Sequence, residues 1–288
     1  MMRALRPRNL LAALLSLGVL AALPLTLGAL PAGASVTIGQ VPDPNAGNCD
    51  AGVDFVQLGV SSGNQYVVPG VGTITFWTVA GGGDRGMLTM KIFRRLGDPP
   101  HFQVVGHAGP QTRTPGGTAA NTFPANVRVR PGDLLGLHTV TATPCAFKDP
   151  GGRPAVFSGD LADGAAAMFG LQAEFDLDIQ AVFVPDNAFT FGGTTRNKKK
   201  GTATLTVNVP NPGELTGSGK DVKVAGAAVI SRTVTAPGDV KLTIRAKGKR
   251  LRKLKDTGVV EVKPRITYTP TGGDASTQSR KLKLKKNR

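Results

Sequence analysis

The chain has 288 residues, of which 35 are lysine or arginine and 19 are aspartate or glutamate, so its formal net charge is +16 at pH 7. Only 5% of the residues are aromatic, and the chain contains two cysteines and three histidines. A structural zinc site takes about four ligands, and the histidines show no paired spacing with the cysteines. The composition therefore argues against a zinc protein, and we expect no metal and no cofactor.

The first 34 residues predict an export signal. Three arginines precede an uncharged apolar run over residues 10–30, and the small-x-small site Ala32-Gly33-Ala34 follows it. An uncleaved anchor is the alternative, because about 20 apolar residues can span a bilayer. We expect cleavage before Ser35, a secreted or cell-envelope location, and no stable membrane span in the mature chain.

Cys49 and Cys145 are the only cysteines. In an oxidising compartment an isolated pair most simply forms one disulfide, and two buried free thiols are the alternative. Closing a loop of this size would stabilise the fold by about 4–5 kcal/mol in the chain-entropy model. We therefore predict a Cys49–Cys145 disulfide.

Charge divides the mature chain into two parts. Residues 35–186 hold nine cations against 13 acids, whereas residues 187–288 hold 23 cations against six acids, which gives net charges of −4 and +17. The sequence also changes from an apolar strand to a lysine run near Asp186. We predict two domains, 35–186 and 187–288, and the charge asymmetry suggests a polyanionic partner for the second.

The first domain is predicted to be a jelly-roll-like sandwich. Strands are expected over 72–80, 87–95 and 102–108, and again on both sides of the turn Pro131-Gly132-Asp133, where Val127 and Val129 alternate with arginines. In the last strand, near 174–184, the row Glu174, Asp176 and Asp178 is expected on a solvated face. Roughly eight short strands in about 150 residues suit this architecture.

The second domain is predicted to be a seven-stranded immunoglobulin-like sandwich, so the fold class is all-β. Residues 201–210, 239–246, 258–270 and 279–286 alternate apolar and polar side chains. Pro264 interrupts the third run and is expected to mark an edge or a bulge there. Leu282 and Leu284 are expected to face inward.

Two segments, NKKKGTATLTVNVPNPGELTGSGK and LKDTGVVEVKPRITYTPTGG, resemble the lysine-rich immunoglobulin-like or fibronectin-type modules at the C-termini of secreted proteins from high-GC bacteria. The motifs TFWTVAGGG, KIFRR and VRVRPGDLLGL are similar to a sandwich domain found beside such modules. The resemblance covers residues 189–286 most clearly and implies an extracellular or wall-associated role without catalysis. It supplies no active-site residues.

The sequence carries no recognised catalytic motif. G-x-S-x-G, P-loop and H-E-x-x-H patterns are all absent, and His101, His107 and His138 have no evident nucleophile accompanied by a third, orienting group. We expect no enzyme. A secreted hydrolase with an unrecognised site is the alternative, and it requires a cleft in the first domain where a histidine approaches a carboxylate.

Two other kinds of site have weaker support in the first domain. Calcium takes six to eight oxygens arranged by a loop, and the available acids follow no such loop pattern: Asp43, Asp50, Asp54, Asp160 and Asp163. A sugar-stacking platform of Trp77, Tyr66 and Phe76 is the alternative to a core position for Trp77, and we expect the core position. A carbohydrate-binding groove in this domain, with the second domain as a spacer, is our alternative function.

The basic clusters of the second domain are residues 196–200, 247–255 and 280–288. Export and the lack of interleaved aromatic residues argue against nucleic acid as the partner. We predict contact with anionic cell-wall or surface polymers, with solubility and protection of strand edges as the alternative role. The candidate residues are Lys198, Lys199, Lys200, Lys247, Lys249, Arg250, Arg252, Lys253, Lys255, Lys281, Lys283 and Lys285. Within 246–258, a single helical turn is expected to direct Leu251 and Leu254 inward and to end at Gly258.

Overall fold

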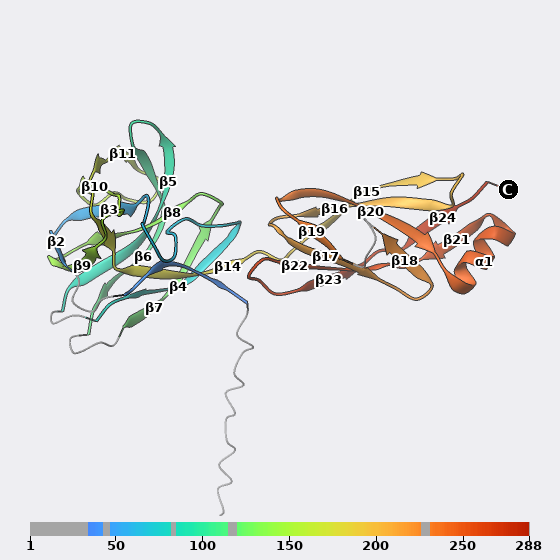
Figure 1. Cartoon of the computed structure of the whole chain (residues 1–288), viewed down its shortest axis with the longest axis horizontal. Coiled ribbons are helices and arrows are strands. Elements are labelled where there is room, and N and C mark those ends of the chain that lie inside the picture. The colour runs from blue at the N-terminus through green and yellow to red at the C-terminus, as the bar shows by residue number, and fades with distance from the viewer. Residues whose placement is uncertain (1–33, 43–46, 82–84, 115–119, 226–230, 288) are drawn as a thin grey trace, which may run out of the picture. The chain divides into compact units, whose positions relative to one another are not determined.

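The computed structural model describes residues 34–42, 47–81, 85–114, 120–225 and 231–287 (Figure 1). All but the last residue of the predicted export signal lie outside these ranges. Within them the fold is all-β, with strands β1 to β24 and one helix, α1. No helix in the described ranges is both long and apolar enough to cross a bilayer.

The first group of strands builds a sandwich from three antiparallel sheets. Their orders are β1-β14-β4-β7, β11-β6-β5-β8-β3-β10-β12 and β13-β9-β2. The bounds are β1 Val36–Gln40, β2 Gly47–Cys49, β3 Val53–Gln57, β4 Gly72–Val79, β5 Met87–Gly97, β6 His101–Thr112, β7 Asn121–Val129, β8 Leu134–Thr139, β9 Thr143–Lys148, β10 Pro154–Ser158, β11 Ala166–Met168, β12 Gly170–Leu171, β13 Phe175–Leu177 and β14 Ile179–Pro185.

The main core of this sandwich lies between the four-stranded and seven-stranded sheets. Trp77 on β4 and Phe183 on β14 belong to the same buried cluster as Met90 on β5 and Leu137 on β8. Trp77 packs beside the ring of Phe123, with 4.9 Å between centroids. The prediction that Trp77 is a core residue is therefore confirmed, and it excludes this ring from a sugar-stacking platform.

The seven-stranded sheet is buried on its other face as well. Phe93 on β5, Phe102 on β6 and Leu134 on β8 form a second apolar cluster with Phe169, which lies between β11 and β12. The Phe169 ring meets Phe93 and Phe102 edge-on, with centroids 5.6 and 5.3 Å apart. The segment after β10 therefore covers part of this face, and polar side chains on the same face become enclosed.

The predicted disulfide is confirmed. Cys49 on β2 is bonded to Cys145 on β9, with 5.7 Å between their Cα atoms, and both residues are buried. The alternation around the turn at 131–133 is confirmed too, because Val127 and Val129 are buried between exposed arginines. Gly132 occupies the left-handed region there, with φ of +85°.

Within residues 187–225 and 231–287, the second group of strands has ten members rather than the seven expected. Its sheets are β15-β16-β20-β18, β19-β17-β22-β23 and β21-β24. Pro264 separates β21 from β22, which belong to different sheets. The bounds are β15 Thr190–Asn197, β16 Thr202–Val209, β17 Gly213–Ser218, β18 Val222–Ala225, β19 Ser231–Val234, β20 Gly238–Ala246, α1 Gly248–Thr257, β21 Val259–Val262, β22 Arg265–Pro270, β23 Ser276–Ser279 and β24 Leu282–Lys285.

This second sandwich has a core of its own. Leu205, Ile244, Ile266 and Tyr268 lie in one buried cluster, to which Leu284 also belongs. The alternation predicted for its strands is visible in β16, where every second residue from Ala203 to Val209 is buried. β14 ends at Pro185 and β15 begins at Thr190, so the boundary predicted near Asp186 falls between the two strands.

Candidate functional site

Strand pairing gathers most cations of the second sandwich at one end. Thr202 pairs with Arg245, Lys223 also pairs with Arg245, and Arg265 pairs with Ser218. The same end holds α1, the chain between β15 and β16, and β24 (Figure 1). We call it the basic end and define it as residues 196–200, 220–223, 245–265 and 280–286. The opposite end carries the acids Glu214, Asp239 and Asp274 near the pairs Val209–Gly238 and Gly213–Pro270.

Hydrogen bonds join the basic clusters 196–200 and 280–288 directly, and they join the second of these to Gly258, the residue that ends α1. The amide of Asn287 donates to the Lys198 carbonyl at 2.9 Å, and the amide of Lys286 donates to the Gly258 carbonyl at 2.8 Å. The Arg196 Nε donates to the Lys283 carbonyl at 2.9 Å. Residues about 90 positions apart in sequence therefore form one continuous surface.

The helix α1 presents its cations to solvent. It is longer than the single turn predicted, and it ends as predicted at Gly258, whose φ is +72° and whose amide donates to the Leu254 carbonyl at 3.0 Å. Leu254 is 1% exposed, whereas Leu251 is 38% exposed. The prediction that both leucines face inward is wrong for Leu251, because residues three apart on a helix are offset by about 60° and only a narrow strip of α1 reaches the core.

Strand β24 adds a row of lysines. Leu282 and Leu284 are buried as predicted, while Lys281, Lys283 and Lys285 are exposed. Successive exposed positions on one face of a strand are about 7 Å apart. Glu261 on β21 pairs directly with Lys283 and is an acid within this surface. The other predicted lysines and arginines are exposed as well: Lys198, Lys199, Lys200, Lys247, Lys249, Arg250, Arg252, Lys253 and Lys255.

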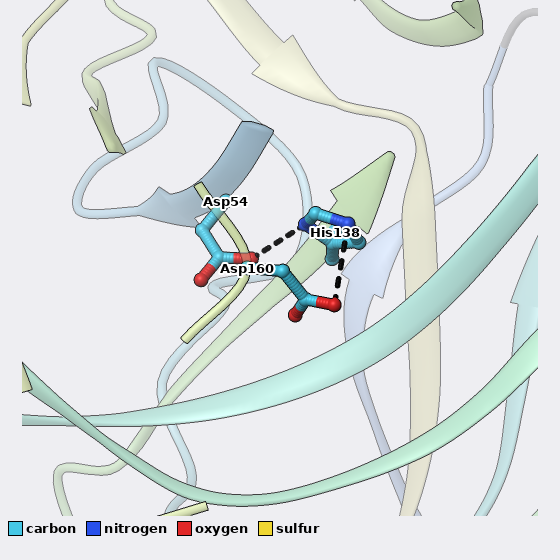
Figure 2. A group of neighbouring side chains, drawn as sticks. All are labelled: Asp54, His138 and Asp160. Carbon is cyan, nitrogen blue, oxygen red and sulfur yellow. Dashed lines mark hydrogen bonds and ion pairs between the residues drawn. The ribbon is translucent and has the colours of Figure 1, made fainter. Parts of the chain in front are cut away.

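A second polar assembly lies inside the first sandwich, on the covered face of the seven-stranded sheet. Asp54 on β3 and His138 on β8 are direct cross-strand partners, and the Nδ1 of His138 lies 2.8 Å from Oδ1 of Asp54 (Figure 2). The Nζ of Lys91, on β5, lies 2.7 and 2.9 Å from the two oxygens of Asp54. All three residues are at most 3% exposed.

Strand alternation explains why these groups share one face. In β3 and β8, Phe55 and Leu137 point into the main core, so Asp54 and His138 point to the opposite side. Gly136 lies between Lys91 and Val56 in the paired strands. A Cβ at Gly136 would overlap the carbonyl oxygen of Phe55 and approach the Phe93 ring to 2.8 Å, so glycine permits the close spacing of strands and rings here.

Asp160 and Leu161, in the segment after β10, complete the hydrogen bonding of the assembly. Asp160 accepts from Lys91 at 2.6 Å, and the Leu161 carbonyl accepts from the same Nζ at 2.8 Å. The Leu161 amide donates to Oδ2 of Asp54 at 3.0 Å. Burial acts to raise the pKa of Asp160, but the hydrogen bond and charge of Lys91 outweigh it and leave this pKa below its usual value. The Asp160 side chain is 67% exposed, so the assembly borders solvent at this residue.

This assembly was not predicted from the sequence, in which Asp54 and Asp160 were considered only as separate calcium ligands. Asp54, His138 and Asp160 offer ligand atoms within 4.8 Å of one another. The donor set does not fit a metal ion, however, because the Lys91 ammonium already occupies the space between the two carboxylates. Among the other acids considered for calcium, Asp163 pairs with His107 at 2.8 Å, Asp50 borders a groove, and Asp43 lies outside the described residues.

The hydrolase alternative required a histidine near a carboxylate within a cleft. His138 and His107 both have carboxylate partners. These carboxylate partners come from strands and loops distant in sequence, so the sequence pattern alone did not identify them. No histidine lines the groove described next.

That groove, of about 780 Å³, is lined by residues of the three-stranded sheet β13-β9-β2, which include Cys49 of the disulfide, and by residues of β3 and β10. Its apolar lining comes from Phe55, Phe147 and Phe175, and its polar lining includes Lys148 and Glu174. Glu174 has φ of +68°, a conformation uncommon for residues other than glycine. Mixed apolar and polar lining of this kind suits a small polar ligand with one flat face.

Two buried carboxyl groups, Asp149 and Asp176, directly follow the groove-lining residues Lys148 and Phe175 in sequence. Asp176 is 0% exposed and accepts hydrogen bonds from the amides of Gln57 and Gln40, at 2.5 and 3.1 Å. Burial, followed by a hydrogen bond with Asp149, raises the pKa of Asp176 to about 7. The side-chain and main-chain hydrogen bonds of Ser61 hold the pKa of Asp149 well below its usual range.

The expected solvated row of Glu174, Asp176 and Asp178 is therefore wrong. Only Glu174 is exposed, whereas Asp176 and Asp178 are buried. Side chains from β1 and β3 cover Asp176, and these strands are more than 100 residues away in sequence. Local alternation showed that Asp176 and Asp178 lie on the face opposite Leu177 and Ile179. It could not show that side chains from other strands bury that face.

The comparisons with known proteins give no family for this chain. No protein-family model matches it, and no curated protein is significantly similar to it.

Proposed function

We propose that the protein is a secreted or cell-envelope-associated binding protein without catalytic activity, and that its basic end binds anionic wall or surface polymers. The observation that carries this proposal is the convergence of three basic clusters on one end of the second sandwich. The Cys49–Cys145 disulfide is compatible with an oxidising compartment.

The chemistry of the basic end favours a charged chain over a compact ligand. Its lysines are exposed on a helix, a turn and a strand, and each presents a point charge on a flexible stem. Aromatic side chains that could stack bases are scarce in the whole chain, where only 5% of residues are aromatic. A polymer of repeating phosphate or carboxylate groups can bind such a surface through charge alone, without aromatic stacking partners.

Binding to purified bacterial envelopes tests the proposal with the full chain. We expect retention on envelopes at about 50 mM salt and release at about 200 mM, because contacts of this kind weaken steeply with ionic strength. A triple variant, Lys199→Gln, Lys253→Gln and Lys285→Gln, removes one charge from each converging segment. It should be retained far less than the wild type.

A matched control separates the basic end from net charge. Arg85, Arg130 and Arg153 are exposed cations of the first sandwich, and their replacement by glutamine lowers the net charge equally. This control should bind like the wild type. Equal loss in both triple variants, or retention that salt does not reduce, would contradict a specific basic end.

The groove gives independent support to a second candidate function, the binding of a carbohydrate by the first sandwich. Phe147 and Phe175 line it together with Lys148 and Glu174, so an apolar sugar face and its hydroxyls both have partners. A neutral glycan array with the full chain tests this. Binding that is lost in Phe175→Ala but kept in the lysine triple variant would support it, and the absence of any neutral ligand would remove it.

A further inference from the structure

The pair of Lys91 and Asp54 is unusual in its enclosure and its position. Their side chains are 3% and 0% exposed, and Nζ faces both carboxylate oxygens, at 2.7 and 2.9 Å. They belong to β5 and β3, which are not neighbours, since β8 runs between them. Burying two charges is costly, and a buried ion pair often contributes little net stability.

We propose that Lys91 and Asp54 are a modification site, at which Nζ of Lys91 and Cγ of Asp54 condense to an intramolecular amide with release of one water. The reaction consumes one ammonium and one carboxylate, so the net charge is unchanged and no oxidant, reductant or nucleotide is needed. The product would connect β3 to β5 covalently across β8.

The groups around Lys91 and Asp54 can orient the amine and stabilise the negative oxygen during amide formation. A proton moves from the Lys91 ammonium to Asp54, which leaves a neutral amine and a carboxylic acid. The amine then attacks Cγ of Asp54. The Leu161 amide, 3.0 Å from Oδ2 of Asp54, donates to the oxygen that becomes negative. The Leu161 carbonyl, 2.8 Å from Nζ, orients the amine.

Proton transfer completes the step. The Asp160 carboxylate, 2.6 Å from Nζ, accepts the proton that the attacking nitrogen must lose. His138 carries its proton on Nδ1, because the carboxylate of Asp54 can only accept, and it donates this proton to Oδ1 as the hydroxyl leaves. Asp160 returns the proton to Nε2 of His138 once it closes from 3.7 Å to hydrogen-bond distance. The C–O bond breaks in the step in which His138 donates its proton, and the water so formed leaves towards solvent past Asp160.

Enclosure makes this condensation favourable here, although it is unfavourable between free molecules in water. Groups held in reacting geometry behave as if at an effective concentration of about 10⁵–10⁸ M. The amide also removes two buried charges and their desolvation cost. The polar assembly, of which Figure 2 draws Asp54, His138 and Asp160, would then act once, on its own chain.

Mass spectrometry of the full chain decides the question. After reduction of the disulfide, the intact protein should be lighter than its sequence by one water, and a protease digest should give one branched peptide joining Lys91 to Asp54. Lys91→Arg keeps the positive charge but has no comparable amine, so it should show the full sequence mass. Asp160→Asn and His138→Gln should slow or stop the mass loss.

Two separate peptides and the full sequence mass in folded wild-type protein would overturn the proposal. This mass measurement needs the wild-type protein alone, so it remains a test of the proposal even if a variant fails to fold. Loss of one water that maps to another pair of residues would overturn it equally. A branched peptide that also forms at the same rate in the Asp160→Asn and His138→Gln variants would remove the roles given to those two side chains.

Discussion

Asp176 lies fully buried with a hydrogen bond to Asp149, and the two carboxyl groups have pKa values displaced in opposite directions. Asp176 is the middle residue of β13, between Phe175, which lines the groove, and Leu177. A change in the protonation of Asp176 therefore takes place within a strand that also lines the groove.

The first prediction concerns pH. The pKa of Asp176 rises from 3.8 to about 7 on folding, so the folded state holds a proton that the unfolded chain releases. The stabilisation is fully present below pH 4 and is lost as pH rises through 7, by at most on the order of 4 kcal/mol. Asp149, with its lowered pKa, acts in the opposite sense, and only as pH falls below about 4.

Asp176→Asn provides the control for that prediction, because the amide stays neutral at every pH. The difference in free energy of unfolding between wild type and variant, measured by urea titration, should change steadily from pH 4 to pH 7. A difference that stays constant over this range would show that Asp176 does not titrate as described.

The second prediction compares two leucines of the same helix. Leu254→Ala removes a buried side chain of α1 and should destabilise the second sandwich by about 2–5 kcal/mol. Leu251→Ala, on the exposed side, should change it by less than about 0.5 kcal/mol. Calorimetry of the two variants gives the comparison, and similar losses would mean that both leucines reach the core.

The third prediction concerns the disulfide, which links residues 96 positions apart. The double variant Cys49→Ser and Cys145→Ser should lose about 4–5 kcal/mol in the free energy of unfolding. Reduction of the wild type should lower its urea midpoint to that of the variant. An unchanged midpoint under reducing conditions would indicate that the crosslink contributes nothing to the folded state.

The fourth prediction tests the spacing of the seven-stranded sheet. Gly136→Ala places a methyl group against Phe55 and Phe93 and should destabilise the first sandwich by about 1–3 kcal/mol. Gly97 lies on β5 with open space around its Cα, so Gly97→Ala is the matched control and should be close to neutral. Thermal unfolding of the two variants should separate them clearly.

Alternation predicted the strands well, because the burial of residues such as Val127 and Leu284 follows directly from a period of two. It could not predict the cover over Asp176, which comes from glutamines on β1 and β3. The convergence of the basic clusters was also beyond reach, since it depends on pairings such as Thr202 with Arg245 that no local pattern contains.

One signal for the Lys91 assembly was present in the sequence. Lys91 lies within TMKIF and His138 within LLGLHT, where apolar residues occupy both faces of the strand. A strand buried on both faces leaves no solvated side for a charged residue, so a lysine there requires a buried partner. The identity of that partner, Asp54, depends on the order β5-β8-β3 and could not be inferred from sequence.

The salt dependence of polymer binding tests the central claim most directly. The affinity of the full chain for poly(glycerol phosphate) should fall linearly on a logarithmic scale of salt concentration. The variant Lys199→Gln, Lys253→Gln and Lys285→Gln should weaken binding and reduce this slope by roughly 2–3. The control with Arg85, Arg130 and Arg153 replaced should keep the wild-type slope. No binding at about 50 mM salt, or the same slope in all three proteins, would contradict a polyanion-binding role for the basic end.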